Sequence, residues 1–147
     1  MGLIRLNNQS PTDVTTLPAA TVSANQKQFV WAFPAAATVS SSDLKYQSGG
    51  ATSTDGSHLN LRCPADMTVK AMYLRINGTP SSGSTVVTLM KNSSTATGTS
   101  ITTNTTTGDY STTTETSFSA GDTIGIRITC SNTTPHWNHV TLLCELD

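Results

Sequence analysis

Apolar and polar residues alternate along much of this chain, most clearly between Ile124 and Cys130. In that stretch every second residue is an isoleucine or cysteine, and the residues between them are Gly125, Arg127 and Thr129. A period of two indicates a strand with one buried face and one face in water. Ser119–Asp122 comes just before it and predicts a tight turn, in which Gly121 can take a positive φ. With Phe118 as an anchor, this stretch predicts the central hairpin of an all-β sandwich.

The same alternation, interrupted by proline, glycine and asparagine, predicts further strands along the chain. The segment 67–77 is apolar on both faces: Met72, Leu74 and Ile76 share one, and Val69, Ala71 and Tyr73 form much of the other. Such a strand is usually covered on both sides, here by the N-terminal segment or by another protomer. The other predicted strands are 28–33, 44–46, 58–63, 84–91 and 137–146.

Residues 93–116 consist almost entirely of Thr, Ser, Gly and Asn. A tract of this composition is often disordered. We predict instead two edge strands, at 99–103 and 111–118, because threonine is β-branched and suits a pleated surface.

About nine short strands with regular turn signals are typical of a sandwich or barrel. We predict one jelly-roll β-sandwich domain at residues 27–147, which consists of eight strands and one additional strand at its N-terminus. An immunoglobulin-type sandwich is the alternative, although no Cys…Trp…Cys spacing supports it. Residues 1–26 lack periodicity and predict an extended arm lying against the domain or a neighbouring subunit. Its apolar residues are the candidate contacts with a neighbouring protein: Leu3, Ile4, Leu6, Val14 and Leu17.

The composition excludes several classes of partner. Charged residues make up 12 % of the chain and the net charge is −1, so nothing favours binding to nucleic acid or to an anionic membrane. No apolar run is long enough to span a membrane, and no export signal is evident at the N-terminus. Threonine (28 residues) and serine (18) make up nearly a third of the chain, so hydroxyl groups keep its surface soluble. These features predict synthesis in a cytoplasm without export by a cleaved signal, and the hydroxyl-rich surface suits a protein that lives in extended contact with other protein or outside the cell.

Cysteine and histidine give little sign of chemistry. The three cysteines, Cys63, Cys130 and Cys144, are an odd number, and we expect buried thiols that act as small hydrophobic groups. A Cys130–Cys144 bridge between neighbouring strands is the alternative. His136 and His139 are three residues apart, so on a strand they point to opposite faces and make a poor metal site.

We therefore expect no catalytic residue, no metal and no cofactor in this chain. The nine carboxylates are scattered, and Asp122 suits turn chemistry. The remaining binding signal is a candidate exposed patch of Trp137, His136 and His139. The indole ring of Trp137 could stack on a sugar, anchor a protein contact or cap the core.

Three segments carry a resemblance to a known family. Together SGSTVVTLMKN (82–92), SFSAGDTIGIRIT (117–129) and WNHVTLLCEL (137–146) resemble the C-terminal two-thirds of jelly-roll proteins of tailed bacteriophages. They are also loosely similar to the tumour-necrosis-factor/C1q-like group, in which a Gly-Asp turn precedes a similar strand. The resemblance covers roughly residues 67–146.

The resemblance implies a capsid decoration (cement) protein. Such a protein binds the outside of the phage head, most often as a homotrimer, and its partners are the major capsid protein and its own copies. It is made in the host cytoplasm and ends on the outer surface of the virion. A receptor- or carbohydrate-binding module of a tail fibre or tip is the second possibility, and a soluble C1q-like ligand is the third.

Overall fold

Every regular element in the described part of the chain is a β-strand. The computed structural model describes residues 27–33, 44–48, 51–53, 61–78, 83–92, 95–104, 107–131 and 137–147. The strands are β1 (Gln28–Phe33), β2 (Leu44–Ser48), β3 (Ala51–Ser53), β4 (Leu61–Arg62), β5 (Met67–Asn77), β6 (Thr85–Lys91), β7 (Thr95–Thr103), β8 (Gly108–Phe118), β9 (Thr123–Cys130) and β10 (Trp137–Leu146). The all-β prediction is confirmed.

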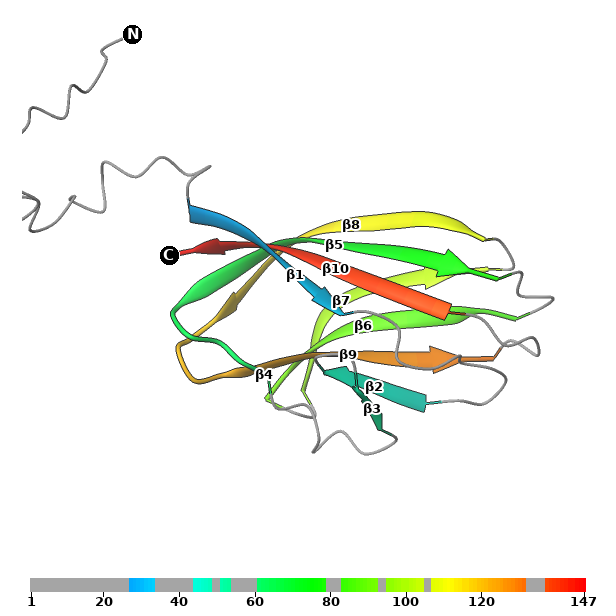
Figure 1. Cartoon of the computed structure of the whole chain (residues 1–147), viewed down its shortest axis with the longest axis horizontal. Coiled ribbons are helices and arrows are strands. Elements are labelled where there is room, and N and C mark those ends of the chain that lie inside the picture. Colours follow the sequence, from blue (N-terminus) through cyan, green and yellow to red (C-terminus); the bar gives the residue numbers. More distant parts are fainter. Residues whose placement is uncertain are drawn as a thin grey trace, which may run out of the picture.

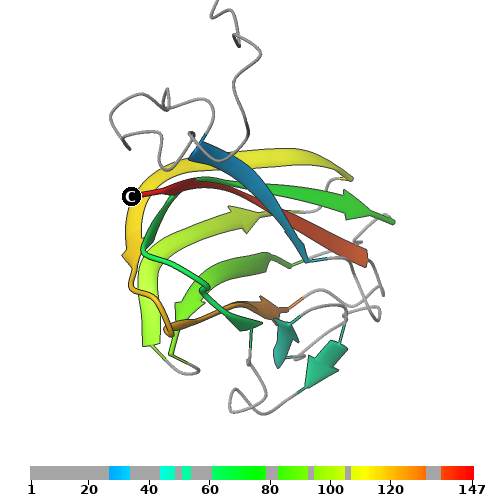
Figure 2. The same ribbon diagram turned by 60° about the vertical axis from the view of Figure 1, so that its left-hand side comes forward.

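The strands form two antiparallel sheets that pack as the two layers of a sandwich (Figure 1). The four-stranded sheet has the order β1-β10-β5-β8. The other has the order β3-β2-β9-β6-β7, and β4 also pairs with β9. Figure 2 shows the two sheets curving around a shared interior. The C-terminus lies beside the start of β1, where Gln28 pairs with Glu145.

The core lies between the sheets and is built from the inward residues of each strand. As the alternation predicts, Ile124, Ile126 and Ile128 are fully buried on β9, which is a central strand. The opposite sheet contributes Met72, Leu74, Ile76, Val140 and Leu142. Each side chain of this kind contributes about 1.5–3 kcal/mol when it leaves water, so the apolar interior holds the layers together.

The predicted central hairpin is wrong. The turn at Ser119–Asp122 exists, and Gly121 has φ of +88°. However, the turn joins β8 of one sheet to β9 of the other, so the two strands do not pair. Phe118 and Ile124 both enter the core, from opposite layers. A period of two reports which face of a strand is buried, but it contains no information about which strand lies beside it.

The longest apolar strand, β5, has the predicted bounds and one displaced side chain. Val69 is buried in the core, although the alternation places it on the outer face with Ala71 and Tyr73. The register against β8 and β10 shifts between Val69 and Ala71. This bulge inserts one extra residue, which brings Val69 and Met72 onto the same face.

The threonine-rich tract forms β7 and β8, each at the edge of its sheet, as predicted. Across the seam between them the hydroxyl oxygens of Thr99 and Thr114 lie 2.7 Å apart, and those of Thr114 and Thr116 2.8 Å apart. Thr99 and Thr116 are also 3.1 Å apart, which completes a triangle. Hydroxyl groups can both donate and accept, so such a cluster satisfies itself where two polar edges meet.

Some predicted features lie outside the described residues. These are the arm at 1–26 with its five candidate contacts, the beginning of the predicted strand at 58–63, and His136. Short strand β3 was not predicted, since three residues are too few to display an alternation.

Candidate functional site

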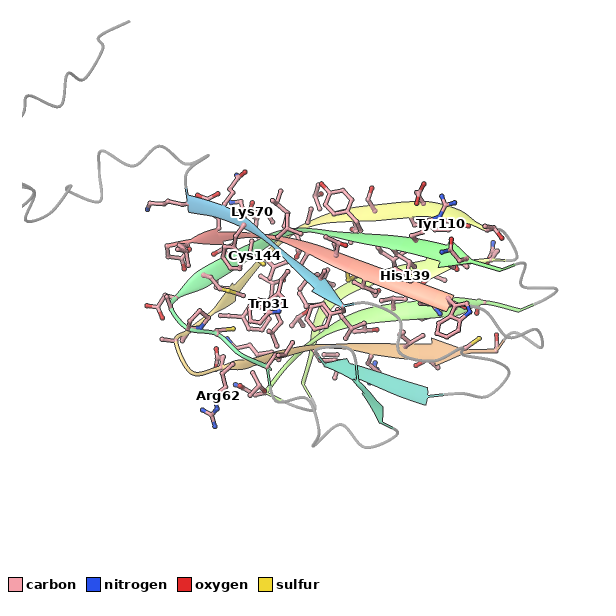
Figure 3. The ribbon with its side chains drawn as sticks, viewed as in Figure 1. Trp31, Arg62, Lys70, Tyr110, His139 and Cys144 are labelled. Atoms are coloured by element: carbon pink, nitrogen blue, oxygen red, sulfur yellow. The ribbon has the colours of Figure 1, made fainter. Side chains whose placement is uncertain are left out.

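Two hollows open on the surface of the described part of the sandwich. The first, which we call the β1 hollow, lies at the sheet edge beside β1 and β4. It has a volume of about 350 Å³ and is lined by Phe29, Val30, Trp31, Arg62 and Pro64. The second, the Tyr73 hollow, lies over β5, β8 and β10. Figure 3 shows Arg62 and His139, one residue from each hollow, toward opposite ends of the molecule.

A row of aromatic rings lines the β1 side of the sandwich. The ring centroids of Phe29 and Trp31 are 6.3 Å apart, and those of Trp31 and Phe33 are 6.4 Å apart and stacked. Phe33 is fully buried, whereas Phe29 and Trp31 are only partly buried against the core. Val30, with its side chain on the other face of the strand, is 64 % exposed. This edge therefore presents apolar surface that the described residues leave uncovered.

The backbone of β1 is also available for pairing. Among the described strands β1 pairs only with β10, which leaves its second edge without a strand partner in that part of the chain. An unpaired edge is a template for a strand from another chain. Aromatic residues and arginine are the types enriched at protein interfaces. The β1 hollow thus combines backbone and side chains suited to a protein contact.

The Tyr73 hollow has a different character. It has a volume of about 290 Å³, and its outward-facing residues come from three adjacent strands: Tyr73 and Arg75, Asp109 and Ser111, and His139 and Thr141. Tyr73 is 47 % exposed. The hollow therefore places an accessible aromatic ring among polar groups on an open sheet.

An ion pair forms one wall of the Tyr73 hollow. Arg75 Nη1 donates to Asp109 Oδ2 at 2.7 Å, and Arg75 Nε donates to Asn77 Oδ1 at 3.1 Å. Two acceptors thus hold the guanidinium group in one orientation. His139 lies directly across the sheet from Arg75. Asp109, the second residue of the edge strand β8, thus has a charged partner on the neighbouring strand.

The predicted aromatic patch is partly assembled. Trp137 is 41 % exposed at the start of β10, opposite Asn77, and His139 lines the Tyr73 hollow two residues further on. Both lie on the outer face. Sequence reasoning missed Arg75 and Asp109, because their partnership is between strands more than thirty residues apart. The feature of the sequence that pointed toward the Tyr73 hollow was the second apolar face of segment 67–77, which includes Tyr73.

The cysteines are buried thiols, as predicted. All three are free. Burial raises the pKa of Cys63 to about 11, with a further contribution from the Asp122 carboxylate, and burial raises the pKa of Cys144 to about 12. Both are therefore neutral at physiological pH and are poor nucleophiles. The alternative Cys130–Cys144 bridge between neighbouring strands is wrong, because both thiols are free and β9 and β10 do not pair with one another.

Asp122 organises the turn between the sheets. Its carboxylate accepts from the Ser119 backbone N–H at 2.8 Å and from Asn92 Nδ2 at 2.9 Å, and it lies 2.8 Å from Lys91 Nζ. The bond from Lys91, followed by those from Asn92 and Ser119, lowers the pKa of Asp122 to about 2. The predicted turn chemistry is confirmed, and the contacts are structural.

We expect Asp122→Asn to weaken the acid dependence of stability. Because the folded pKa lies below the ordinary carboxylate value of about 3.9, the stabilisation is present above that value and is lost as pH falls from about 4 toward 2. Melting curves between neutral pH and pH 2 should show that the variant is less stable at neutral pH and loses less on acidification. The control variant is Glu115→Gln, which removes the carboxylate of an exposed ion pair with Lys70. An identical pH profile for wild type and Asp122→Asn would contradict this role.

Two further properties bear on the class of protein. In the described ranges no group of three or more His, Cys, Asp or Glu side chains is arranged to hold a metal ion. The same ranges contain no helix that is long and apolar enough to cross a membrane.

No protein-family model matches this chain, and no match was found among curated proteins. What the fold and surface define is a class: an all-β sandwich with an open apolar edge and a separate polar hollow.

Proposed function

We propose that this chain is a non-enzymatic structural protein of a phage virion, a decoration protein that binds the outside of the head. In this role it joins neighbouring major capsid proteins, as a homotrimer of the kind that the resemblance implies. The single observation that carries the proposal is the exposed β1 edge, with Val30 64 % exposed beside an apolar hollow.

The strand order supports a jelly roll. β1, β5, β8 and β10 lie in one sheet, and β2, β6, β7 and β9 lie in the other. A jelly roll consists of eight strands arranged in two such sheets. On this interpretation β3 and β4 are additions between β2 and β5. The same architecture is expected from the resemblance of residues 67–146 to phage jelly rolls.

The position of the β1 hollow favours docking to a protein shell. Residues 1–26, with the apolar anchors Leu3, Ile4 and Leu6, come immediately before β1 in the chain. The arm therefore leads directly into the strand that supplies three of the lining residues of the hollow. An apolar centre of aromatic residues, with Arg62 beside it, resembles the centre of a protein interface.

The mechanism is thermodynamic linkage. A protein that binds only the assembled shell stabilises the shell by its binding free energy. Specific interfaces commonly bury about 1,600 Å² in total. Many copies bound across capsomer junctions multiply the effect and raise the barrier to rupture under internal pressure.

We expect Val30→Asp to abolish binding without unfolding the domain. The side chain is largely exposed, so the free protein tolerates a carboxylate, whereas docking would bury an unpaired charge at large cost. Co-sedimentation with bare capsids of the parent phage should fall at least tenfold, which corresponds to about 1.4 kcal/mol.

Thr102→Asp supplies the matched control, since Thr102 is exposed on β7, the edge strand of the other sheet. This variant should sediment as wild type does. Equal loss in both variants would indicate a general effect of charge, and undiminished binding of Val30→Asp would exclude the β1 edge from the contact.

A further inference from the structure

The Tyr73 hollow differs from an ordinary polar patch on a sheet. Cross-strand ion pairs are common on exposed sheet faces and need no ligand to explain them. The same two strands contain such a pair in Lys70–Glu115, with Nζ and Oε2 2.7 Å apart, and neither residue lines the Tyr73 hollow or the β1 hollow. What distinguishes Arg75–Asp109 is its place beside an exposed tyrosine ring and a histidine.

The hollow combines an apolar surface with closely spaced donors and acceptors. Tyr73 pairs with Thr141 on one side and Ser111 on the other, so hydroxyl groups flank its ring across the sheet. Two residues further along β5, Arg75 pairs with His139 on one side and with Asp109 on the other, and these three residues form a second row. Beyond them lies Trp137, which is 41 % exposed on the same face.

The charges in the hollow balance. Arg75 and Asp109 neutralise one another at 2.7 Å, and their side chains remain 50 % and 75 % exposed. A strongly anionic ligand would meet the Asp109 carboxylate, and a cationic ligand would meet the guanidinium group. Both groups nevertheless offer directional hydrogen bonds to a neutral ligand that carries hydroxyl groups.

We propose that the Tyr73 hollow binds a neutral sugar residue of a glycan. One face of a pyranose ring is lined by C–H groups and packs against the negative face of an aromatic ring. Its edge carries hydroxyls that each need a donor and an acceptor, which Arg75, Asp109 and His139 supply. A volume of about 290 Å³ is at the lower limit of ordinary ligand pockets, so the hollow takes one or two sugar units.

This activity does not depend on the proposed attachment to a capsid. The Tyr73 hollow lies on the outer face over β5, β8 and β10, whereas the β1 hollow lies at the edge beside β4. The two hollows share no lining residue, so a substitution in one hollow leaves the other intact. The two proposals therefore fail separately.

The test is a titration of the full chain with methyl glycosides of glucose, galactose and mannose, followed by amide chemical shifts. At least one glycoside should give saturable shifts at Tyr73, Ser111 and His139, with a dissociation constant in the millimolar range that is usual for a small solvent-exposed site, about −4 kcal/mol. Tyr73→Ala should weaken binding at least tenfold, and Tyr73→Phe should retain it, because the ring remains. Arg75→Ala should weaken binding at least tenfold.

Lys70→Ala is the matched control, because it removes a cation from an ion pair on the same strands and should change affinity less than twofold. Absence of saturable shifts with all three glycosides would overturn the proposal. Shifts confined to β1, or binding that survives Tyr73→Ala, would also overturn it. A preference for sialic acid over the neutral glycosides would contradict the neutral ligand. In the capsid assay Tyr73→Ala should sediment as wild type does, which separates the two functions.

Discussion

Replacing Phe118 with alanine is expected to lower the free energy of unfolding by about 3–5 kcal/mol, the usual cost of emptying a buried phenylalanine site. Phe118 is 1 % exposed and stands where the chain leaves β8 for the other sheet. Its backbone pairs with that of Met67, which is fully buried, and Lys91 Nζ lies 5.3 Å from the ring centroid. The change would therefore remove core packing and a cation–π contact together.

Denaturant unfolding monitored by tryptophan fluorescence will measure this loss. Domains of this size are stable by roughly 5–15 kcal/mol, so the variant should unfold at a much lower denaturant concentration. Thr113→Ala, at an exposed position on the same strand, should stay within about 0.5 kcal/mol of wild type. A loss below about 1 kcal/mol in Phe118→Ala would mean that the turn does not depend on this anchor.

Removing residues 2–20 is expected to leave a folded domain that no longer binds capsids. Full burial of a leucine or isoleucine side chain contributes about 1.5–3 kcal/mol, so the loss of Leu3, Ile4 and Leu6 from an interface should weaken binding at least a hundredfold. The described core is built from strand residues between Phe33 and Cys144, so we expect the melting temperature to stay close to that of wild type.

A second variant separates the anchors from the length of the arm. Serine at positions 3, 4 and 6 keeps the chain complete and removes only the apolar side chains. It should reproduce the loss of co-sedimentation. Unchanged capsid occupancy in both variants would remove the arm from the proposal and would leave the β1 hollow as the remaining contact.

The sequence was most informative about the bounds of the long apolar strands. The bounds predicted for β5 and β10 agree with the structure, since both strands have a continuous buried face. The two threonine-rich edge strands were also predicted, because β-branched side chains favour extended backbone. The bulge in β5 was not predictable, since a single inserted residue alters the phase without altering the composition.

The candidate sites were only partly accessible from the sequence. Trp137 and His139 were selected as exposed aromatic and polar groups, and His139 does line the Tyr73 hollow. Tyr73, Arg75 and Asp109 were not selected as a group, because their proximity depends on the pairing of β5 with β8 and β10. Each appears ordinary on its own strand.

The sequence alone therefore determined that this protein is an all-β sandwich. It also indicated which side of the long strands is buried, because side chains alternate along extended backbone, although Val69 on β5 lies on the face opposite to the predicted one. Only the tertiary structure decided that β8 and β9 belong to different sheets, that Cys130 and Cys144 lie on strands of different sheets, and that three distant strands meet to form a hollow. These outcomes depend on long-range strand pairing, which the local period of a strand does not record.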